Sequence, residues 1–198
     1  LFDIIVNNLH FTQQLLLIGH NDPLNGQLRF GAKLSGGHSS AILACQRAAR
    51  RYNVSHIFYP LMNTDMFNMD YVVPPMYRYD MPIINLRGEI IFDDFMHMVN
   101  GQQAPMATIY TFAGKELNSD PTVPCAWIGA KPIYVNGDYE FAARSKCRNW
   151  QSREPTETGL AVHVPMNSNA TAFLDQSNLY DESCAKRCSI LCIQISPN

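Results

Sequence analysis

The sequence has no long hydrophobic run, no block of like charges and little charge overall. No stretch approaches the roughly 18 consecutive apolar residues of a membrane-spanning helix, and the nearest, residues 15–18, is only the size of a strand. Lys and Arg number 15 against 17 Asp and Glu, which gives a net charge of −2. That charge creates no field strong enough to attract nucleic acid or an anionic membrane. We therefore expect a chain with no membrane insertion and no nucleic-acid partner.

The short motifs of common enzyme classes are missing as well. The sequence contains no G-x-S-x-G and no glycine loop of the Walker or dinucleotide-binding type. Residues 35–40 read SGGHSS and place serines beside His38, so a secreted hydrolase built on His38 is one alternative. A helix is expected to begin at this point, which favours a turn or capping role for His38. Asp93 and Asp94 likewise read as helix-start residues and not as an acid–base pair. We predict that the chain is not an enzyme.

Close cysteine pairs are also absent, although the chain has six cysteines. Structural zinc is usually held by C-x2-C pairs, and none is present. Cys184, Cys188 and Cys192 stand four residues apart, but the run 187–195 reads as a strand buried on both faces. Side chains four apart on a strand lie about 13 Å apart at roughly 3.3 Å per residue, so Cys188 and Cys192 cannot share one ion. Disulfides are therefore favoured over a zinc site or a redox thiol site.

Two glycosylation sequons accompany this even number of cysteines. Their acceptors are Asn53, followed by Val and Ser, and Asn169, followed by Ala and Thr. Even cysteines together with sequons favour an oxidising, secretory route. The chain begins at Leu1 without an initiator methionine or a secretion signal, so we expect a mature or excised fragment whose signal lay upstream. An extracellular protein is predicted.

The composition is typical of one folded domain. Apolar residues make up 46% of the 198 residues and charged residues 16%, which fits a single hydrophobic core and excludes a disordered chain. No repeat or linker-like segment is evident. We expect an N-terminal lead segment at residues 1–14 and one domain at residues 15–196.

Strand-like and helix-like patterns are interleaved irregularly, which predicts an α+β fold. The expected strands are at 14–18, 56–59, 82–86, 108–112 and 187–195, and a shorter apolar segment at 89–92 follows an Arg-Gly turn. The expected helices are at 38–53, 94–99 and 139–150. The first helix has the clearest pattern, with Ser39 or Ser40 as its N-terminal cap and Asn53 as its stop. Asp93 is expected to cap the second helix.

Two groups of basic residues are candidate binding sites. One is formed by Arg47, Arg50 and Arg51 on one side of the first expected helix. The other lies around Cys147 and contains Arg144, Lys146 and Arg148. Such groups engage sulfated glycans through charge-assisted contacts. The alternative is that they form an ordinary solvated face, since the chain as a whole is slightly acidic.

An ordered series of short motifs resembles endostatin, the C-terminal domain of the multiplexin collagens, types XV and XVIII. The motifs are NDPLNG at 21–26, CQRAAR at 45–50, PIINL at 82–86, IYTFAGK at 109–115, PTVP at 121–124, CRNW at 147–150, and the pairs SC at 183–184 and LC at 191–192. The likeness runs over about residues 15–196. It implies a compact fold related to C-type lectin domains, with a mixed, mostly antiparallel sheet, two main helices and disulfide staples.

The resemblance also implies a nested disulfide pattern. Carried over residue by residue, Cys45 pairs with Cys192 and Cys147 pairs with Cys184. Cys125 and Cys188 are additional to the family pattern, and parity suggests a third bridge between them.

Departures from the family pattern bear on ligands. Vertebrate members bind zinc through N-terminal histidines and an aspartate, but here Leu16 and Tyr77 stand at or near two of those positions, while His10 and His20 are out of register. We therefore expect no metal site and no cofactor. The arginine that follows the Cys-x-x-Trp motif in the family is Gln151 here.

These observations predict a non-enzymatic module of the extracellular matrix or basement membrane, belonging to a parent chain that is a collagen trimer. Its expected partners are matrix or cell-surface proteins and heparan sulfate, with Arg47, Arg50, Arg51 and Arg148 as the glycan-binding residues. The resemblance implies roles in cell migration, adhesion and axon or synapse organisation. The alternative is a secreted, calcium-independent, lectin-like domain, because the calcium motifs of true C-type lectins are absent.

Overall fold

The computed structural model describes residues 13–29, 36–117, 119, 122–136 and 138–197. Almost all of the expected lead segment 1–14, including His10, lies outside the described residues. The strands are β1 Leu15–Gly19, β2 Phe58–Pro60, β3 Ile83–Ile84, β4 Ile90–Phe92, β5 Cys125–Trp127, β6 Ala130–Val135, β7 Asp138–Ala143, β8 Thr158–His163, β9 Leu179–Ser183 and β10 Leu191–Gln194. The helices are α1 His38–Arg51, α2 Phe95–Val99, α3 Cys147–Trp150 and the 3₁₀ turns η1 Met69–Tyr71 and η2 Pro75–Tyr77.

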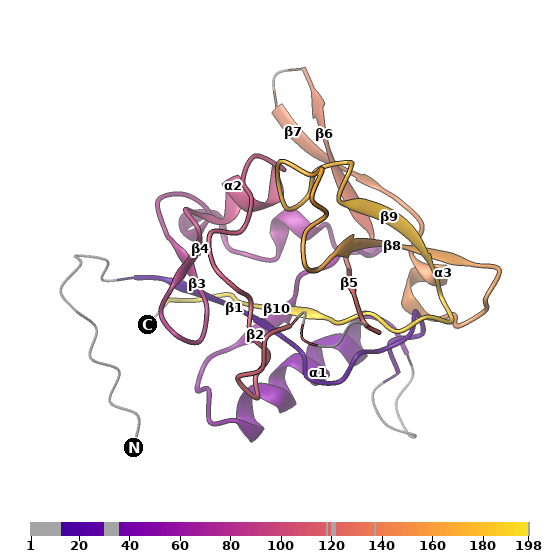
Figure 1. The fold of residues 1–198 in the computed structure, drawn as a ribbon, viewed down its shortest axis with the longest axis horizontal. Helices are drawn as coiled ribbons and strands as arrows, with labels where there is room; N and C mark the ends of the chain where they lie inside the picture. Colours follow the sequence, from indigo (N-terminus) through magenta and orange to yellow (C-terminus); the bar gives the residue numbers. More distant parts are fainter. Residues whose placement is uncertain (1–12, 30–35, 118, 120–121, 137, 198) are drawn as a thin grey trace.

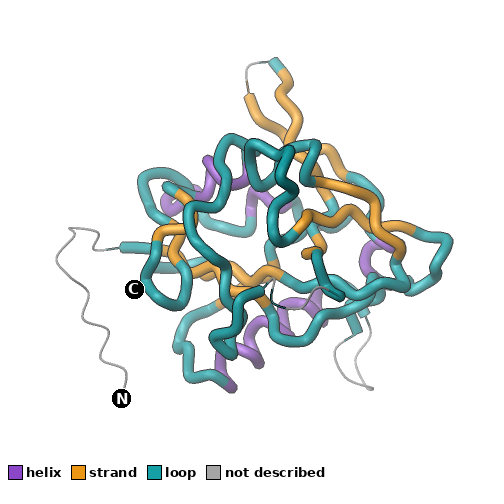
Figure 2. The backbone as a smooth tube through the Cα atoms, in the orientation of Figure 1, coloured by secondary structure: helices purple, strands orange, loops and turns teal. Residues whose placement is uncertain are grey.

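The described residues form three sheets, which are mostly antiparallel. The largest has the strand order β2-β10-β1-β3-β4, and its β1–β3 pair is parallel while its other pairs are antiparallel. The order β5-β8-β9 forms a second sheet, and β6-β7 forms a hairpin that projects from the domain (Figure 1). The short strands are joined by long loops, and α1 lies along one side (Figure 2). This arrangement confirms the predicted α+β class.

The central strands β1 and β10 form where the sequence has its most apolar runs. Four of the five residues of β1 and all four residues of β10 are buried, which is the pattern of strands covered on both faces. Their pairing places Ile18 opposite Cys192. The strands expected at 14–18 and at the C-terminal end of 187–195 are therefore confirmed, and they lie together in the middle of the domain (Figure 1).

Helix α1 begins and ends through backbone conformations that the sequence only partly indicated. Its N-cap is Gly37, with φ of 96°, and no side chain caps it, so the expected cap by Ser39 or Ser40 is wrong. A glycine reaches that φ without the steric cost of a Cβ atom. At the other end Asn53 takes the left-handed φ of 58° that commonly stops a helix, as expected.

Three disulfides cross the core. Cys45 on α1 is bonded to Cys192 on β10, Cys147 to Cys184, and Cys125 on β5 to Cys188. The pairs coincide with those expected from the resemblance and from parity. All six cysteines are at most 2% exposed and belong to one buried cluster that also contains the fully buried side chains of Trp127 and Trp150.

The segment 139–150, expected to be one helix, is helical only in its last turn, α3. Its first part is strand β7, which pairs along its length with β6. Its last four residues, Cys147 to Trp150, all have φ between 47° and 64°, which is a left-handed turn. L-residues enter this region at a cost of roughly 1–2 kcal/mol each, so a sequence without glycine gives no sign of it. Strand pairing and the buried cysteine and tryptophan override the local pattern.

Two smaller expectations also need correction. The cap of α2 is Asp94, whose carboxylate accepts the backbone N–H of His97 at 2.8 Å, and not Asp93. The run expected as a strand at 108–112 contributes only isolated bridges, from Tyr110 to Glu116 and from Thr111 to Gly19. Within the described residues, no helix has both the length and the apolar composition that a membrane span requires.

Candidate binding surface

Arg47, Arg50 and Arg51 form an exposed basic face on the last turns of α1, which we call the arginine face. Residues three and four apart on a helix are surface neighbours, so Arg47 lies next to both Arg50 and Arg51 on the helix surface. The opposite face of the helix is buried and carries Ala44, Cys45, Ala48 and Ala49. None of the three arginines forms an ion pair with another described residue. The C-terminal dipole of α1 also favours positive charge here.

Arg148 lies apart from the arginine face. Its guanidinium forms an ion pair with Glu157. Its neighbour Asn149 lies beside the start of α1, because a Cβ atom built on Gly37 would be 3.7 Å from the Asn149 carbonyl oxygen. Arg50 is 13 residues further along the helix, about 20 Å at 1.5 Å per residue. The structure therefore brings three of the four expected glycan-binding arginines together and leaves the fourth at the other end of α1.

The other basic residues near Cys147 are also placed by the fold. Lys146 forms an ion pair with Asp65. Arg144 is exposed and its backbone N–H donates to the carbonyl of Gly129 at 3.1 Å. This group does not join the arginine face either.

A two-lobed cleft, which we call the Tyr52 cleft, begins directly beside the arginine face. Its arginine lobe of about 170 Å³ includes Arg47 and Arg51 in its wall. Its inner lobe of about 310 Å³ extends to the loop 111–119. The two lobes share four lining residues: His20, Asn21, Asp22 and Tyr52.

His20 is a buried part of the wall of this cleft. Its side chain is only 2% exposed, and burial lowers the pKa of the imidazole below its usual value of 6.5. Nδ1 lies 3.1 Å from the backbone nitrogen of Asp22 and 3.0 Å from its carbonyl oxygen, and the ring is also hydrogen-bonded to the backbone of Ala44. These bonds fix the loop after β1 against α1, so the ring anchors the cleft wall.

Thr111 lies in the wall of the inner lobe and has an unused hydroxyl. The residue is 7% exposed, and its Oγ1 is buried without a hydrogen-bond partner among the described residues. Two backbone hydrogen bonds fix its main chain. Its N–H donates to the carbonyl of Lys115 at 2.8 Å, and its carbonyl accepts the backbone N–H of Gly114 at 2.8 Å. Sequence reasoning singled out neither Thr111 nor Tyr52, because only the folded loop shows which threonine faces a cavity.

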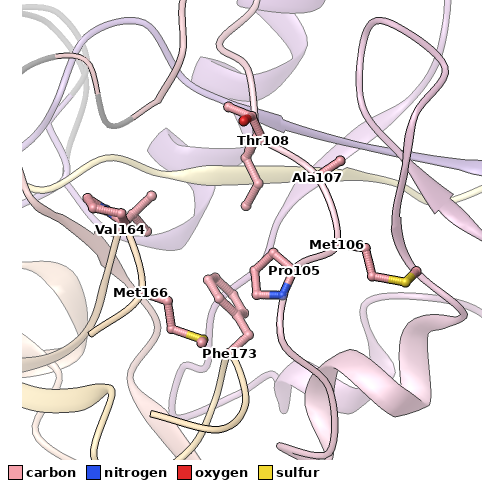
Figure 3. Close-up of a pocket in the computed structure, with 9 residues that line it drawn as sticks. Pro105, Met106, Ala107, Thr108, Val164, Met166 and Phe173 are labelled. Atoms are coloured by element: carbon pink, nitrogen blue, oxygen red, sulfur yellow. The ribbon is translucent and has the colours of Figure 1, made fainter. Parts of the chain in front are cut away.

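A second, mainly apolar cavity of about 350 Å³ lies between the loop 105–109 and the segment after β8. Figure 3 shows Pro105, Val164, Met166 and Phe173 around it, with Thr108 at its upper side. Its lining has no charged side chain. It therefore differs in chemistry from the Tyr52 cleft.

The residues considered for catalysis or metal binding take structural positions. His38 stacks on Phe67 with ring centroids 5.6 Å apart, its Nε2 is buried without a hydrogen-bond partner among the described residues, and burial lowers its pKa. Leu16 and Tyr77 pack against the two core clusters. The described residues contain no group of three His, Cys, Asp or Glu side chains placed to hold a metal ion.

Both sequon asparagines are at the surface. Asn53 is exposed and directly follows the arginine face, and Asn169 is exposed in the loop between β8 and β9.

Comparison with known proteins agrees with this architecture. The family model Endostatin, described as Collagenase NC10 and Endostatin, matches residues 15–197. The human collagen alpha-1(XVIII) chain is 28% identical over 156 residues, which cover 76% of this chain and 8% of that protein. The chain thus corresponds to a small part of this relative. Because the family model spans nearly all of the described domain, this three-disulfide chain belongs to the Endostatin family.

Proposed function

We propose that the chain is a non-enzymatic module of the extracellular matrix that binds anionic glycans, heparan sulfate above all, through the arginine face. The observation that carries this proposal is the exposure of Arg47, Arg50 and Arg51 without an acidic partner among the described residues. Guanidinium groups bind carboxylate and sulfate oxygens through paired, charge-assisted hydrogen bonds. Unpaired guanidinium groups on one rigid helix need little reorganisation to do so.

A matrix setting is supported by the similarity to a collagen chain, with a collagen trimer as the proposed parent and matrix or cell-surface proteins as further partners. Three buried disulfides and two exposed sequons fit a secreted protein. Through such partners the module would influence cell migration, adhesion and axon or synapse organisation.

Heparin affinity tests the arginine face. The triple variant Arg47→Ala, Arg50→Ala, Arg51→Ala is expected to weaken heparin binding, and the slope of log affinity against log salt should fall by about one per arginine removed. Arg148→Ala is the control for each single variant of the face, because it also removes one exposed guanidinium but lies at the other end of α1. Equal retention of the triple variant and the wild type on heparin at about 0.15 M salt would refute the proposal.

Glycosylation tests the secretory route. Asn53 and Asn169 are expected to carry glycans when the chain is expressed in a secreting animal cell line, because both are accessible. Enzymatic removal of N-glycans should then lower the intact mass. In Asn53→Gln and in Asn169→Gln this decrease in mass should be smaller, because each variant lacks one glycan. An unchanged mass would show that neither sequon is used.

A second candidate function, calcium-independent sugar binding, is favoured by the polar Tyr52 cleft beside the arginine face.

A further inference from the structure

We propose that the inner lobe of the Tyr52 cleft binds one pyranose ring of an acidic glycan, while an acidic group of the same glycan contacts Arg47 and Arg51 in the arginine lobe. This inference rests on the proposed glycan-binding function and extends it from a charged surface to a site that recognises a sugar ring. The lobes are adjacent, because His20, Asn21, Asp22 and Tyr52 line both of them. A ligand that passes over these shared residues would contact both lobes.

The unused hydroxyl of Thr111 is the first support. Buried polar groups are normally hydrogen-bonded, and an unpaired one costs free energy. Thr111 is 7% exposed, lines the inner lobe, and has no partner for Oγ1 among the described residues. A hydroxyl both donates and accepts, so rotation of this buried side chain toward the lobe would give a partner to a ligand that carries hydroxyl groups.

The remaining polar groups of the inner lobe suit the same ligand. Asp22 and Glu116 offer carboxylate oxygens that accept from hydroxyl groups, and Lys115 offers an ammonium group that donates to them. Ser189, which is 5% exposed, adds a second hydroxyl to the wall. Mixed donors and acceptors around a cavity of about 310 Å³ fit a polyol better than a simple anion or an apolar ligand.

Tyr52 stands between the two lobes and is 36% exposed, so part of its ring is free to pack against a sugar face. The Arg51 guanidinium lies 5.8 Å from the centroid of that ring. The charged groups around the arginine lobe are Arg47, Arg51 and Asp22. Cations therefore outnumber anions there, and an acidic substituent is favoured on that side of the ring.

Substitution of Thr111 by valine separates this proposal from a structural role. Valine has nearly the same shape and removes only the hydroxyl, which has no partner among the described residues, so the thermal midpoint of Thr111→Val should equal or exceed that of the wild type. Glucuronic acid, titrated by saturation-transfer NMR, should bind the wild type and bind Thr111→Val about tenfold more weakly. Thr156→Val, at an exposed loop threonine, is the matched control and should bind like the wild type.

Three probes distinguish the outcomes. Glucuronic acid should bind through both lobes, glucose more weakly through the inner lobe alone, and inorganic sulfate through the arginines alone. The double variant Arg47→Ala, Arg51→Ala should therefore bind glucuronic acid more weakly than the wild type and bind glucose equally well. Equal affinity of wild type and Thr111→Val for glucuronic acid would overturn the inference, as would sulfate binding that matches glucuronic acid in strength.

Failure of this inference and failure of the proposed function give different results. If heparin binding needs the arginine face but no sugar responds to Thr111→Val, the cleft proposal is wrong and the glycan-binding face stands. If heparin binding is unchanged by the arginine substitutions while glucose binding depends on Thr111, the proposal of a glycan-binding arginine face is wrong and the sugar site in the inner lobe stands.

Discussion

Removing the bridge between Cys45 and Cys192 by alanine substitution of both residues is expected to lower the free energy of unfolding by about 5 kcal/mol. The bond closes a loop with a sequence separation of 147 residues. In the chain-entropy account, a cross-link stabilises mainly by restricting the unfolded chain, and the effect grows with the logarithm of loop length. This bridge closes the longest of the three loops, so its loss should cost the most.

The native packing around this bridge strengthens the expectation. The buried face of α1 is made mainly of small side chains, Ala41, Ala44, Ala48 and Ala49. Alanine buries little apolar area, so each contributes only a fraction of what a leucine or phenylalanine would. The covalent bond to β10, in the middle of the largest sheet, therefore supplies much of the attachment of α1. Because α1 carries the arginine face, heparin binding should fall along with stability.

Cys125→Ala with Cys188→Ala is the matched control. It removes two equally buried cysteines and opens a loop of separation 63, for which the same account gives about 4 kcal/mol. Both variants are compared with the wild type by chemical denaturation, and the midpoints and slopes are read separately because a lost cross-link also changes the unfolded state. A larger loss for the control than for the variant without the Cys45 bridge would contradict the argument.

The sequence predicted the elements that have a clear apolar pattern of their own. Helix α1 has apolar residues at helical spacing, and β1 and β10 are nearly continuous apolar runs, so each was located within a few residues. The pairing of Cys45 with Cys192 came from the family resemblance, since spacing alone cannot choose among the pairings of six cysteines. The arginine face followed from α1, because three exposed positions on one helix are set by the helix itself.

The parts that were missed depend on contacts between distant segments. Asp65 lies far from Asn149 in sequence, yet its backbone N–H donates to the Asn149 side chain at 3.0 Å. Such contacts hold the turn at Cys147–Trp150 in a left-handed conformation that local propensity disfavours. The Tyr52 cleft is missed for the same reason, since its walls come from the loop after β1, the end of α1 and the loop 111–119.

Replacing Trp150 by alanine is the second substitution with a large expected effect, a loss of about 3–5 kcal/mol in the free energy of unfolding. The side chain is 0% exposed, and its ring lies 5.7 Å from that of Trp127 between centroids. Gly129 leaves room for it, since a Cβ atom there would lie 2.6 Å from Trp150 Cζ2. Alanine would leave a cavity in a buried cluster that is cross-linked by disulfides, and the cost is highest where the neighbours close a cavity least.

Trp150→Phe separates the ring from its hydrogen bond. The indole Nε1–H donates to the carbonyl of Asn63 at 2.7 Å, and that bond is buried. Phenylalanine retains much of the apolar volume but leaves the carbonyl without this donor, so its loss should be smaller than that of alanine and still measurable, about 1–3 kcal/mol. Thermal and denaturant unfolding give both values. If alanine and phenylalanine cost the same, the ring contributes little and the hydrogen bond dominates.

The same residue reports on how the left-handed turn is held. Four residues with positive φ form this turn. The Cys147–Cys184 bond fixes its first residue, and the packing of Trp150 fixes its last. Loss of either restraint lets the turn relax. The two restraints therefore act on one strained segment, and their effects should not add. In a double-mutant cycle, Trp150→Ala should cost less in the Cys147→Ala, Cys184→Ala background than in the wild type, because the turn is already free to relax there. Additive losses within about 0.5 kcal/mol would show that the tryptophan packs independently of the turn.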